Sequence, residues 1–144
     1  MSTIHFQLVA LSGVKFDDDV YEVILPTMEG EIGVLQDHMP LVSVAANGVV
    51  AVRRDPKTLD SQREYFAISG GVIDIRDNGL RVLVDEADHA DDINEAEVEA
   101  AMERAKQMKA EAKDQVSLDH AQAMVDRHAV RLQVAGLKRR RQRN

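Results

Sequence analysis

The sequence predicts an all-β sandwich over residues 1–87, followed by an antiparallel α-helical hairpin over residues 88–144. Short runs of alternating apolar and polar residues, broken by turn residues about every eight to twelve positions, continue to residue 84. The acidic segment 85–92 then offers little apolar surface to bury, so we place a boundary there. Beyond it, small apolar residues recur at spacings of three and four, the period of a helix.

Period-two alternation defines the expected strands, which are residues 4–9, 20–25, 41–44, 49–53, 64–68, 72–76 and 80–84. Asn47-Gly48 is a turn signal, and Asp77-Asn78-Gly79 has the chemistry of a tight hairpin. The acidic run Asp17–Asp19 is expected to form a solvated turn, and Ser69-Gly70-Gly71 a corner. Many short strands with such turns indicate a sandwich or a barrel.

The stretch of residues 29–42 is expected to be a shaped loop between strands, because Gly30 and Gly33 supply backbone angles that other residues resist. A phosphate-binding loop would place a lysine and a Ser or Thr after the glycines, and neither is present. From the residues alone, a tight β corner with a surface carboxylate is the simpler interpretation.

The second part is expected to contain two helices of about twenty residues each. Asp92 is the expected cap of the first helix, with Glu95 at the third position, and Ser117 is the expected cap of the second. The apolar stripe of the first helix is Val98, Ala101, Met102, Ala105, Met108 and Ala112; that of the second is Leu118, Ala121, Val125, His128, Leu132 and Ala135. Because alanine seams bury little area, we expect a hairpin that leaves the sandwich at modest free-energy cost.

Composition excludes several classes of function. Without cysteine there are no disulfides or thiolate metal sites, and a formal net charge of −7 argues against generic nucleic-acid binding. We expect no signal peptide, no membrane-spanning segment, no cofactor, no metal site and no catalytic constellation. The five histidines form no i, i+4 pair, and His128 is expected to pack between helices with one hydrogen-bond partner.

A basic tail ends the chain and is its strongest local concentration of charge. Two interpretations remain open: a solubilising helix end that complements the helix dipole, or an electrostatic contact for an acidic partner surface. Nucleic-acid binding is disfavoured, because no aromatic platform accompanies the charge. The tail residues are Lys138, Arg139, Arg140, Arg141 and Arg143.

Four motifs in order carry a resemblance that covers nearly the whole chain: residues 29–34, 38–41, 68–72 and 82–85. Together they resemble the epsilon subunits of the bacterial F-type ATP synthase. The resemblance implies a ten-stranded sandwich that binds the gamma subunit and the c-ring, in a non-catalytic rotor subunit of the central stalk of a proton-translocating enzyme. It also implies a peripheral position on the cytoplasmic face of the bacterial plasma membrane, and a hairpin that inhibits ATP hydrolysis.

The same resemblance assigns residues to partners. The c-ring and gamma interface would be formed by Glu29, Glu31, His38, Met39 and Pro40. An extended hairpin would carry the basic tail to acidic surfaces of the alpha and beta subunits.

The chain departs from the family at the start of its first helix. Many relatives carry an ATP-binding motif there, an Ile/Leu-Asp pair followed two residues later by Arg-Ala. Here Asn94 replaces the aspartate, Glu97 the arginine and Val98 the alanine, so ATP binding does not carry over to these positions. Two rival hypotheses remain, a nucleotide-sensing β-sandwich with a helical clasp and an uncharacterised sandwich enzyme.

Overall fold

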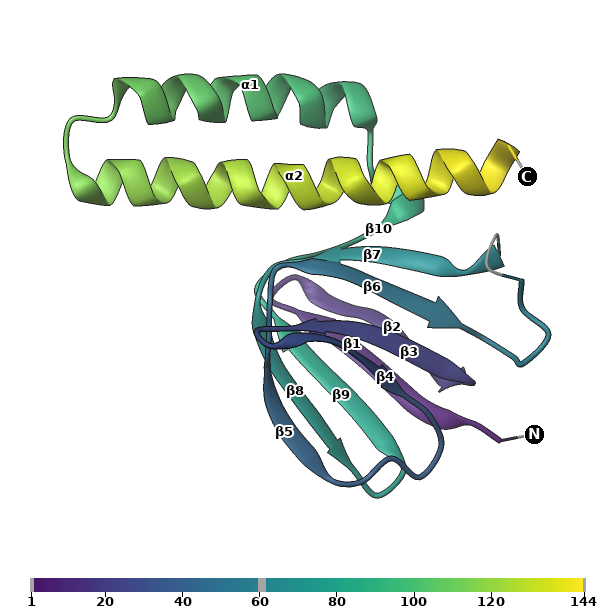
Figure 1. Cartoon of the computed structure of the whole chain (residues 1–144). Helices are drawn as coiled ribbons and strands as arrows, with labels where there is room; N and C mark the ends of the chain where they lie inside the picture. The colour runs from purple at the N-terminus through teal and green to yellow at the C-terminus, as the bar shows by residue number, and fades with distance from the viewer. Residues whose placement is uncertain (1, 60–61, 144) are drawn as a thin grey trace.

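The computed structural model describes residues 2–59 and 62–143, the last three by their backbone alone, and it confirms a β-sandwich followed by a two-helix hairpin (Figure 1). The ten strands are β1 (Ile4–Ala10), β2 (Gly13–Val20), β3 (Glu22–Thr27), β4 (Gly30–Val34), β5 (Leu41–Ala45), β6 (Gly48–Arg53), β7 (Glu64–Ile68), β8 (Gly71–Arg76), β9 (Gly79–Val84) and β10 (Ala87–His89). A 3-10 turn, η2 (Ala90–Asp92), leads into helices α1 (Glu95–Glu111) and α2 (Gln115–Arg143).

One ten-stranded sheet folds over on itself to form the two layers. Its order is β10-β7-β6-β3-β5-β8-β9-β1-β2, with β4 paired to β3 off this path. The layers join where Thr27 of β3 pairs with Ala45 of β5. The β8–β9 connection is the predicted tight hairpin, since Asp77 and Asn78 both have positive φ, as a two-residue type I′ turn requires.

The core lies between the two layers and consists of aliphatic and phenylalanine side chains. Strand β1 shows the pattern clearly, because Ile4, Phe6 and Leu8 are fully buried and their neighbours point outward. At the corner after β7, a Cβ on Gly71 would overlap the Leu83 carbonyl, so the close approach of β8 to β9 requires glycine there. The sandwich therefore has one continuous apolar core.

The prediction of a turn at Asp17–Asp19 was wrong, because these residues belong to strand β2. Their backbone pairs with β1, and basic side chains contact the carboxylates: His5 contacts Asp17 at 2.6 Å and Asp19 at 2.7 Å, and Arg54 contacts Asp18 at 2.9 Å. The hydrogen bonds to Asp19 and Asp17 raise the pKa of His5 above its ordinary value. Strand β2 lies at the edge of the sheet, where charged side chains discourage pairing with another chain.

The interpretation of residues 29–42 as one loop was also wrong in its first half. Residues 30–34 form strand β4, which pairs in register with β3 from Val23↔Val34 to Thr27↔Gly30. Of the two glycines, Gly30 has the backbone angle that other residues resist: its φ of 121° lies in the region that favours glycine. It follows the turn between β3 and β4. The irregular part is therefore limited to residues 35–40.

Helix α2 lies between α1 and the sandwich, over strands β6 and β7, and the loop end of the hairpin projects beyond the sandwich (Figure 1). Both predicted helix caps were off by a few residues. Asn94, rather than Asp92, caps α1 by accepting a hydrogen bond from the Glu97 amide. Asp114, rather than Ser117, caps α2, because its side chain accepts from the Ser117 amide at 2.7 Å. Helix α2 is also longer than predicted, since its 29 residues continue through Gly136 into the tail.

Candidate partner-binding surface and hairpin latch

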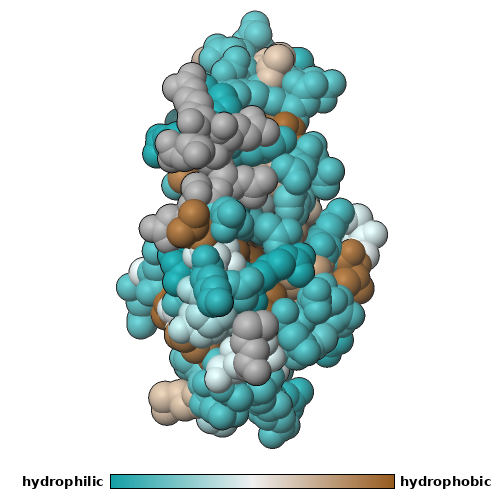
Figure 2. Space-filling model, turned by 90° about the vertical axis from the view of Figure 1, so that its right-hand side faces the viewer, coloured by the Kyte–Doolittle hydropathy of each residue, from teal (hydrophilic) through white to brown (hydrophobic). Residues whose placement is uncertain are grey.

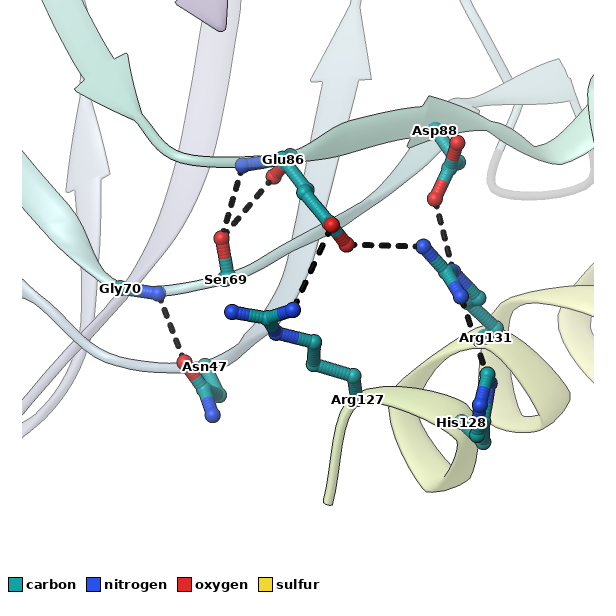
Figure 3. Close-up of polar contacts among 8 residues, drawn as sticks. All are labelled: Asn47, Ser69, Gly70, Glu86, Asp88, Arg127, His128 and Arg131. Atoms are coloured by element: carbon teal, nitrogen blue, oxygen red, sulfur yellow. Dashed lines mark hydrogen bonds and ion pairs between the residues drawn. The ribbon is translucent and has the colours of Figure 1, made fainter. Parts of the chain in front are cut away.

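The segment between β9 and β10 presents a carboxylate, Glu86, to the hairpin. Its backbone is fixed by the buried Ser69, whose amide donates to the Glu86 carbonyl at 3.0 Å and whose hydroxyl accepts from the Glu86 amide at 2.8 Å. The corner beside Ser69 is held in turn by Asn47, whose side-chain oxygen accepts from the Gly70 amide at 2.6 Å (Figure 3). Glu86 is therefore held on the rigid part of the molecule.

Two arginines one helical turn apart on α2 meet this carboxylate (Figure 3). Arg127 Nη1 lies 3.3 Å from Glu86 Oε1, and Arg131 Nη2 lies 2.9 Å from Glu86 Oε2. Arg131 also donates through Nε to Asp88 Oδ2 at 2.8 Å. These four residues join the hairpin to the sandwich, and we call them the hairpin latch.

The apolar contact beside the latch is small. It joins the buried residues Ala67, Ala90 and Val134 to four partly buried ones, Val49, Tyr65, Ile93 and Val130. The latch side chains keep between 23% and 44% of their surface exposed, so solvent screens the ion pairs. Exposed pairs contribute about 0.2–1 kcal/mol each, and the hairpin is therefore held by a few weak terms that salt reduces.

His128 is a buried residue of α2, which confirms the prediction of a packing histidine. It is 9% exposed, and its Nδ1 lies 3.3 Å from Arg131 Nη1. Burial lowers the pKa of His128 below its ordinary value, and the neighbouring charge of Arg131 lowers it further. Both effects favour the neutral form of the ring in this structure.

Part of the basic tail is engaged at the base of the hairpin. Lys138 Nζ lies 3.4 Å from Asp91 Oδ1, and Arg139 Nη2 lies 3.1 Å from Glu95 Oε1. Arg140 is exposed, whereas the side chains of Arg141 and Arg143 lie outside the described residues. In this conformation Asp91 of the acidic segment 85–92 and Glu95 of α1 thus pair with two of the predicted tail cations.

The three residues that replace the family's ATP-binding motif lie at the start of helix α1. Asn94 Oδ1 accepts from the Glu97 amide at 3.2 Å, the Glu97 side chain is exposed, and Val98 is half-buried. Between the latch and strand β7, a partly open cavity of about 10 Å³ is close to the space of one water molecule.

The predicted interface residues lie at two ends of strand β4 rather than in one cluster. Glu29 and Glu31 are exposed at the β3–β4 turn and just after it. His38, Met39 and Pro40 follow the opposite end of β4, and Met39 is 72% exposed. These two groups therefore present separate surfaces of the sandwich.

Sequence reasoning missed an apolar row on the outer face of the layer that contains β5, β8, β9, β1 and β2. Direct register pairs join Val44 to Val72, Val72 to Leu83, Leu83 to Val9, and Val9 to Val14, so the five side chains share one face across five strands. Four of them are well exposed, at 58% for Val44, 45% for Val72, 43% for Leu83 and 58% for Val14. By contrast, the face seen in Figure 2 is mostly hydrophilic, with only scattered apolar residues.

A signal for this row was present in the sequence. Strand residues alternate between the two faces, so an apolar doublet puts one side chain inside and one outside. Val44-Ala45, Val72-Ile73 and Val82-Leu83 are such doublets, and their inner members Ala45, Ile73 and Val82 are buried. Exposed apolar side chains gathered in one place mark a surface that another molecule covers.

Two negative findings apply to the described part of the chain. Within residues 2–59 and 62–143, no three or more His, Asp or Glu side chains are arranged to hold a metal ion. Over the same residues, neither helix combines the length and the apolar character that crossing a bilayer requires.

Comparisons with known proteins agree with this architecture. Residues 3–90 match the family described as the β-sandwich domain of the ATP synthase delta/epsilon chain. The chain is 32% identical over 133 residues to the ATP synthase epsilon chain of Gloeobacter violaceus, which covers 92% of this chain and 97% of that one.

Two solved structures share the fold. One is a chain in the Euglena gracilis mitochondrial ATP synthase, OSCP/F1/c-ring in rotational state 1, with a TM-score of 0.76, 21% identity, and coverage of 94% of this chain and 82% of that chain. The other is a chain in the central stalk/c-ring of the Tetrahymena thermophila mitochondrial ATP synthase, with a TM-score of 0.55, 17% identity, and coverage of 93% and 95%.

Proposed function

This chain belongs to the ATP synthase epsilon-chain family, and from that membership we propose that it is a non-catalytic rotor subunit of the central stalk. In this role it binds the gamma subunit and the c-ring and couples ring rotation to the catalytic head of a proton-translocating enzyme. Its place is then peripheral, on the cytoplasmic face of the bacterial plasma membrane. Central-stalk and c-ring complexes are the context of the two structural relatives, which supports the proposal.

The observation that carries the proposal is the apolar row. A coupling subunit needs a rigid, extended attachment, and this row crosses five hydrogen-bonded strands whose inner faces form the core. A row centred on Val72 and Leu83 supplies the apolar centre of a protein interface, with polar neighbours at its rim. We assign the row to the gamma subunit.

The predicted interface residues supplement the row. We propose that Glu29 and Glu31, exposed at the turn side of β4, face polar loops of the c-ring. The loop of His38, Met39 and Pro40 then lies near gamma and the ring. It is held to the sandwich by the Asp37 amide, which donates to Asn78 Oδ1 at 2.9 Å.

The hairpin acts, in this proposal, as a brake on ATP hydrolysis. Docked, it keeps Lys138 and Arg139 paired to Asp91 and Glu95. Released, it carries the tail residues Lys138, Arg139, Arg140, Arg141 and Arg143 to acidic surfaces of the alpha and beta subunits. Because the hairpin latch consists of partly exposed ion pairs, the cost of release is modest.

Co-purification with gamma tests the attachment. Val72→Glu places a charge in the centre of the row and should weaken gamma binding by about 2 kcal/mol, roughly thirtyfold. Arg76→Glu changes charge on the same strand, outside the row, and should bind gamma nearly as the parent does. Equal gamma binding by Val72→Glu and the parent, with both chains folded by circular dichroism, would remove the row from the interface.

A further inference from the structure

A groove lies between the hairpin and the sandwich, directly beside the apolar row. It has a volume of about 570 Å³, and both parts of the molecule line it. The sandwich contributes the β1–β2 turn, with Leu11, and the segment after β9, with Asp85. The hairpin contributes Arg127 and Arg131 of α2. Release of the hairpin removes one wall, so the groove exists only in the docked conformation.

Backbone pairing makes this groove continuous with the apolar row. Val9 and Leu83 of the row are direct partners on β1 and β9. Two residues further along the same strands, the Leu11 amide donates to the Asp85 carbonyl at 3.3 Å. Two residues of a strand span roughly 7 Å, so Leu11 and Asp85 border the row on the side of the groove. A partner that covers the row therefore reaches the edge of the groove.

The chemistry of the groove favours an apolar occupant. Leu11 is 85% exposed, which makes it the most exposed large apolar side chain in the described part of the chain. The two arginines are already paired with carboxylates of the hairpin latch, and Lys15 and Asp85 place one charge of each sign on the sandwich wall. These charges balance, so they give a free ion little net attraction, whereas the apolar surface of Leu11 remains to be covered.

We propose that a segment of the gamma subunit continues from the apolar row into this groove, places an apolar side chain against Leu11 and contacts α2. Gamma binding then stabilises the docked hairpin. This inference rests on the proposed function, in which gamma covers the row. The coupling is reciprocal, because the factor by which gamma favours docking equals the factor by which docking strengthens gamma binding. Such factors are typically about 5- to 150-fold.

The consequence concerns the cost of releasing the hairpin. In the free chain, the hairpin latch and a small apolar contact hold the hairpin. In the assembled complex, the gamma segment in the groove adds a contact that must also break. The hairpin of the assembled subunit should therefore be released less readily than that of the free chain.

Amide hydrogen exchange in α2, with and without gamma, tests the coupling in the intact chain. Saturating gamma should slow exchange in α2 at least about fivefold, because a docked helix opens less often. Leu11→Ser removes apolar surface from the groove without touching the core, so it should lose most of this slowing while still binding gamma through the row. Leu59→Ser makes the same change on the β6–β7 loop, at a residue that is 62% exposed, and should respond as the parent does.

The outcomes of this comparison separate the two proposals. Gamma binding without any change in α2 exchange would overturn the proposed coupling and leave the attachment through the row in place. Equal slowing in the parent and in Leu11→Ser would overturn the groove as its route. A parent chain that does not bind gamma would reject the proposed function, and this inference with it.

The reverse measurement changes docking and follows gamma binding. Val134 is fully buried beside Ala67 and Ala90, outside the groove, so Val134→Asp should release the hairpin. Fast exchange in α2 with unchanged exchange in β8 and β9 would identify a released hairpin on a folded sandwich. Calorimetry should then show gamma affinity lowered by the factor by which gamma slows α2 exchange in the parent, about fivefold or more.

Gamma affinity equal to that of the parent in this released variant would overturn the proposal, because docking would then contribute nothing to gamma binding. If Val134→Asp does not fold, the comparison of Leu11→Ser with Leu59→Ser decides the proposal, since both changes lie at exposed positions.

Discussion

The sandwich buries one continuous cluster of Phe, Ile, Leu and Val side chains, whereas the buried apolar residues of the two helices are three alanines and one valine. Fully burying a Val, Leu, Ile or Phe side chain contributes about 1.5–3 kcal/mol, and alanine has far less surface to contribute. The hairpin compensates with charge, through Glu86 and Asp88 on one side and Arg127 and Arg131 on the other. The sandwich is therefore the stable part of the molecule, because it buries large apolar side chains. The hairpin is the weakly attached part, because it buries little apolar surface and relies on ion pairs.

The largest effect is expected from breaking the sandwich. Phe66 is 1% exposed and stacks edge-on against both Phe16 and His89. Phe66→Ala should lower the free energy of unfolding by about 3–5 kcal/mol, measured by urea denaturation. On the hairpin, the exposed Val116 offers a control, since Val116→Ala should change the free energy of unfolding by less than about 0.5 kcal/mol.

The next effect is expected in the hairpin latch. Arg131→Ala removes three contacts, to Glu86, Asp88 and His128, and should weaken docking by about 1.5–3 kcal/mol. Amide hydrogen exchange in α2 should accelerate at least about tenfold, with exchange in β8 and β9 unchanged. Lys109→Ala is the control on an exposed position of α1. Faster amide hydrogen exchange in β8 and β9 of Arg131→Ala would contradict the prediction that the sandwich is stabilised independently of the hairpin.

Removal of residues 137–144 should have a smaller effect on stability. It deletes the Lys138–Asp91 and Arg139–Glu95 pairs, which are worth about 0.2–1 kcal/mol each. In the complex, hydrolysis should rise, most clearly at low salt, while gamma binding stays intact. Hydrolysis that is unaltered at both low and high salt would leave the tail as a solubilising helix end.

Glu31→Lys should leave folding and hairpin docking unchanged, because the side chain is exposed at one end of the sandwich. Its expected effect is on coupling, through charge reversal where the sandwich meets the ring. Proton pumping in membrane vesicles should fall at equal hydrolysis rate. Pumping at the parent's level would argue against the assignment of Glu31 to the c-ring.

The smallest expected effect is that of ATP on the isolated chain. A charge-assisted arginine–phosphate contact contributes about 1.5–3 kcal/mol, and Glu97 stands where the family motif places that arginine. Millimolar ATP should therefore leave hairpin docking unchanged when followed by hydrogen exchange. Calorimetric binding in the micromolar range would contradict this expectation.

Local patterns predicted the core strands and the helical hairpin correctly, because burial imposes a period that is visible in the sequence. Strand β7 was predicted at its observed bounds, Glu64–Ile68. The prediction failed for β2 and β4, whose aspartates and glycines disfavour strands locally. Tertiary partners decide these cases: His5 and Arg54 for the aspartates, and pairing with β3 for β4.

The hairpin latch was beyond sequence reasoning for a different reason. Arg127 and Arg131 are recognisable as an i, i+4 pair, but nothing in the sequence states which carboxylates they meet. The partners lie about forty residues earlier, and they are positioned by the bonds between Ser69 and the Glu86 backbone. The resemblance supplied a family, and the structure supplied the contacts.

The continuity of helix α2 makes release cooperative. The latch arginines and tail cations stand on one unbroken helix without proline, so they move as a single rigid element. When one ion pair breaks, the helix gains little conformational freedom, because the other pairs still hold it in place. The contacts should therefore open together. The switch between docked and released forms should be steep, with few half-open molecules at its midpoint. Gly136, between Arg131 and Lys138, is the weakest point at which a partial opening would begin.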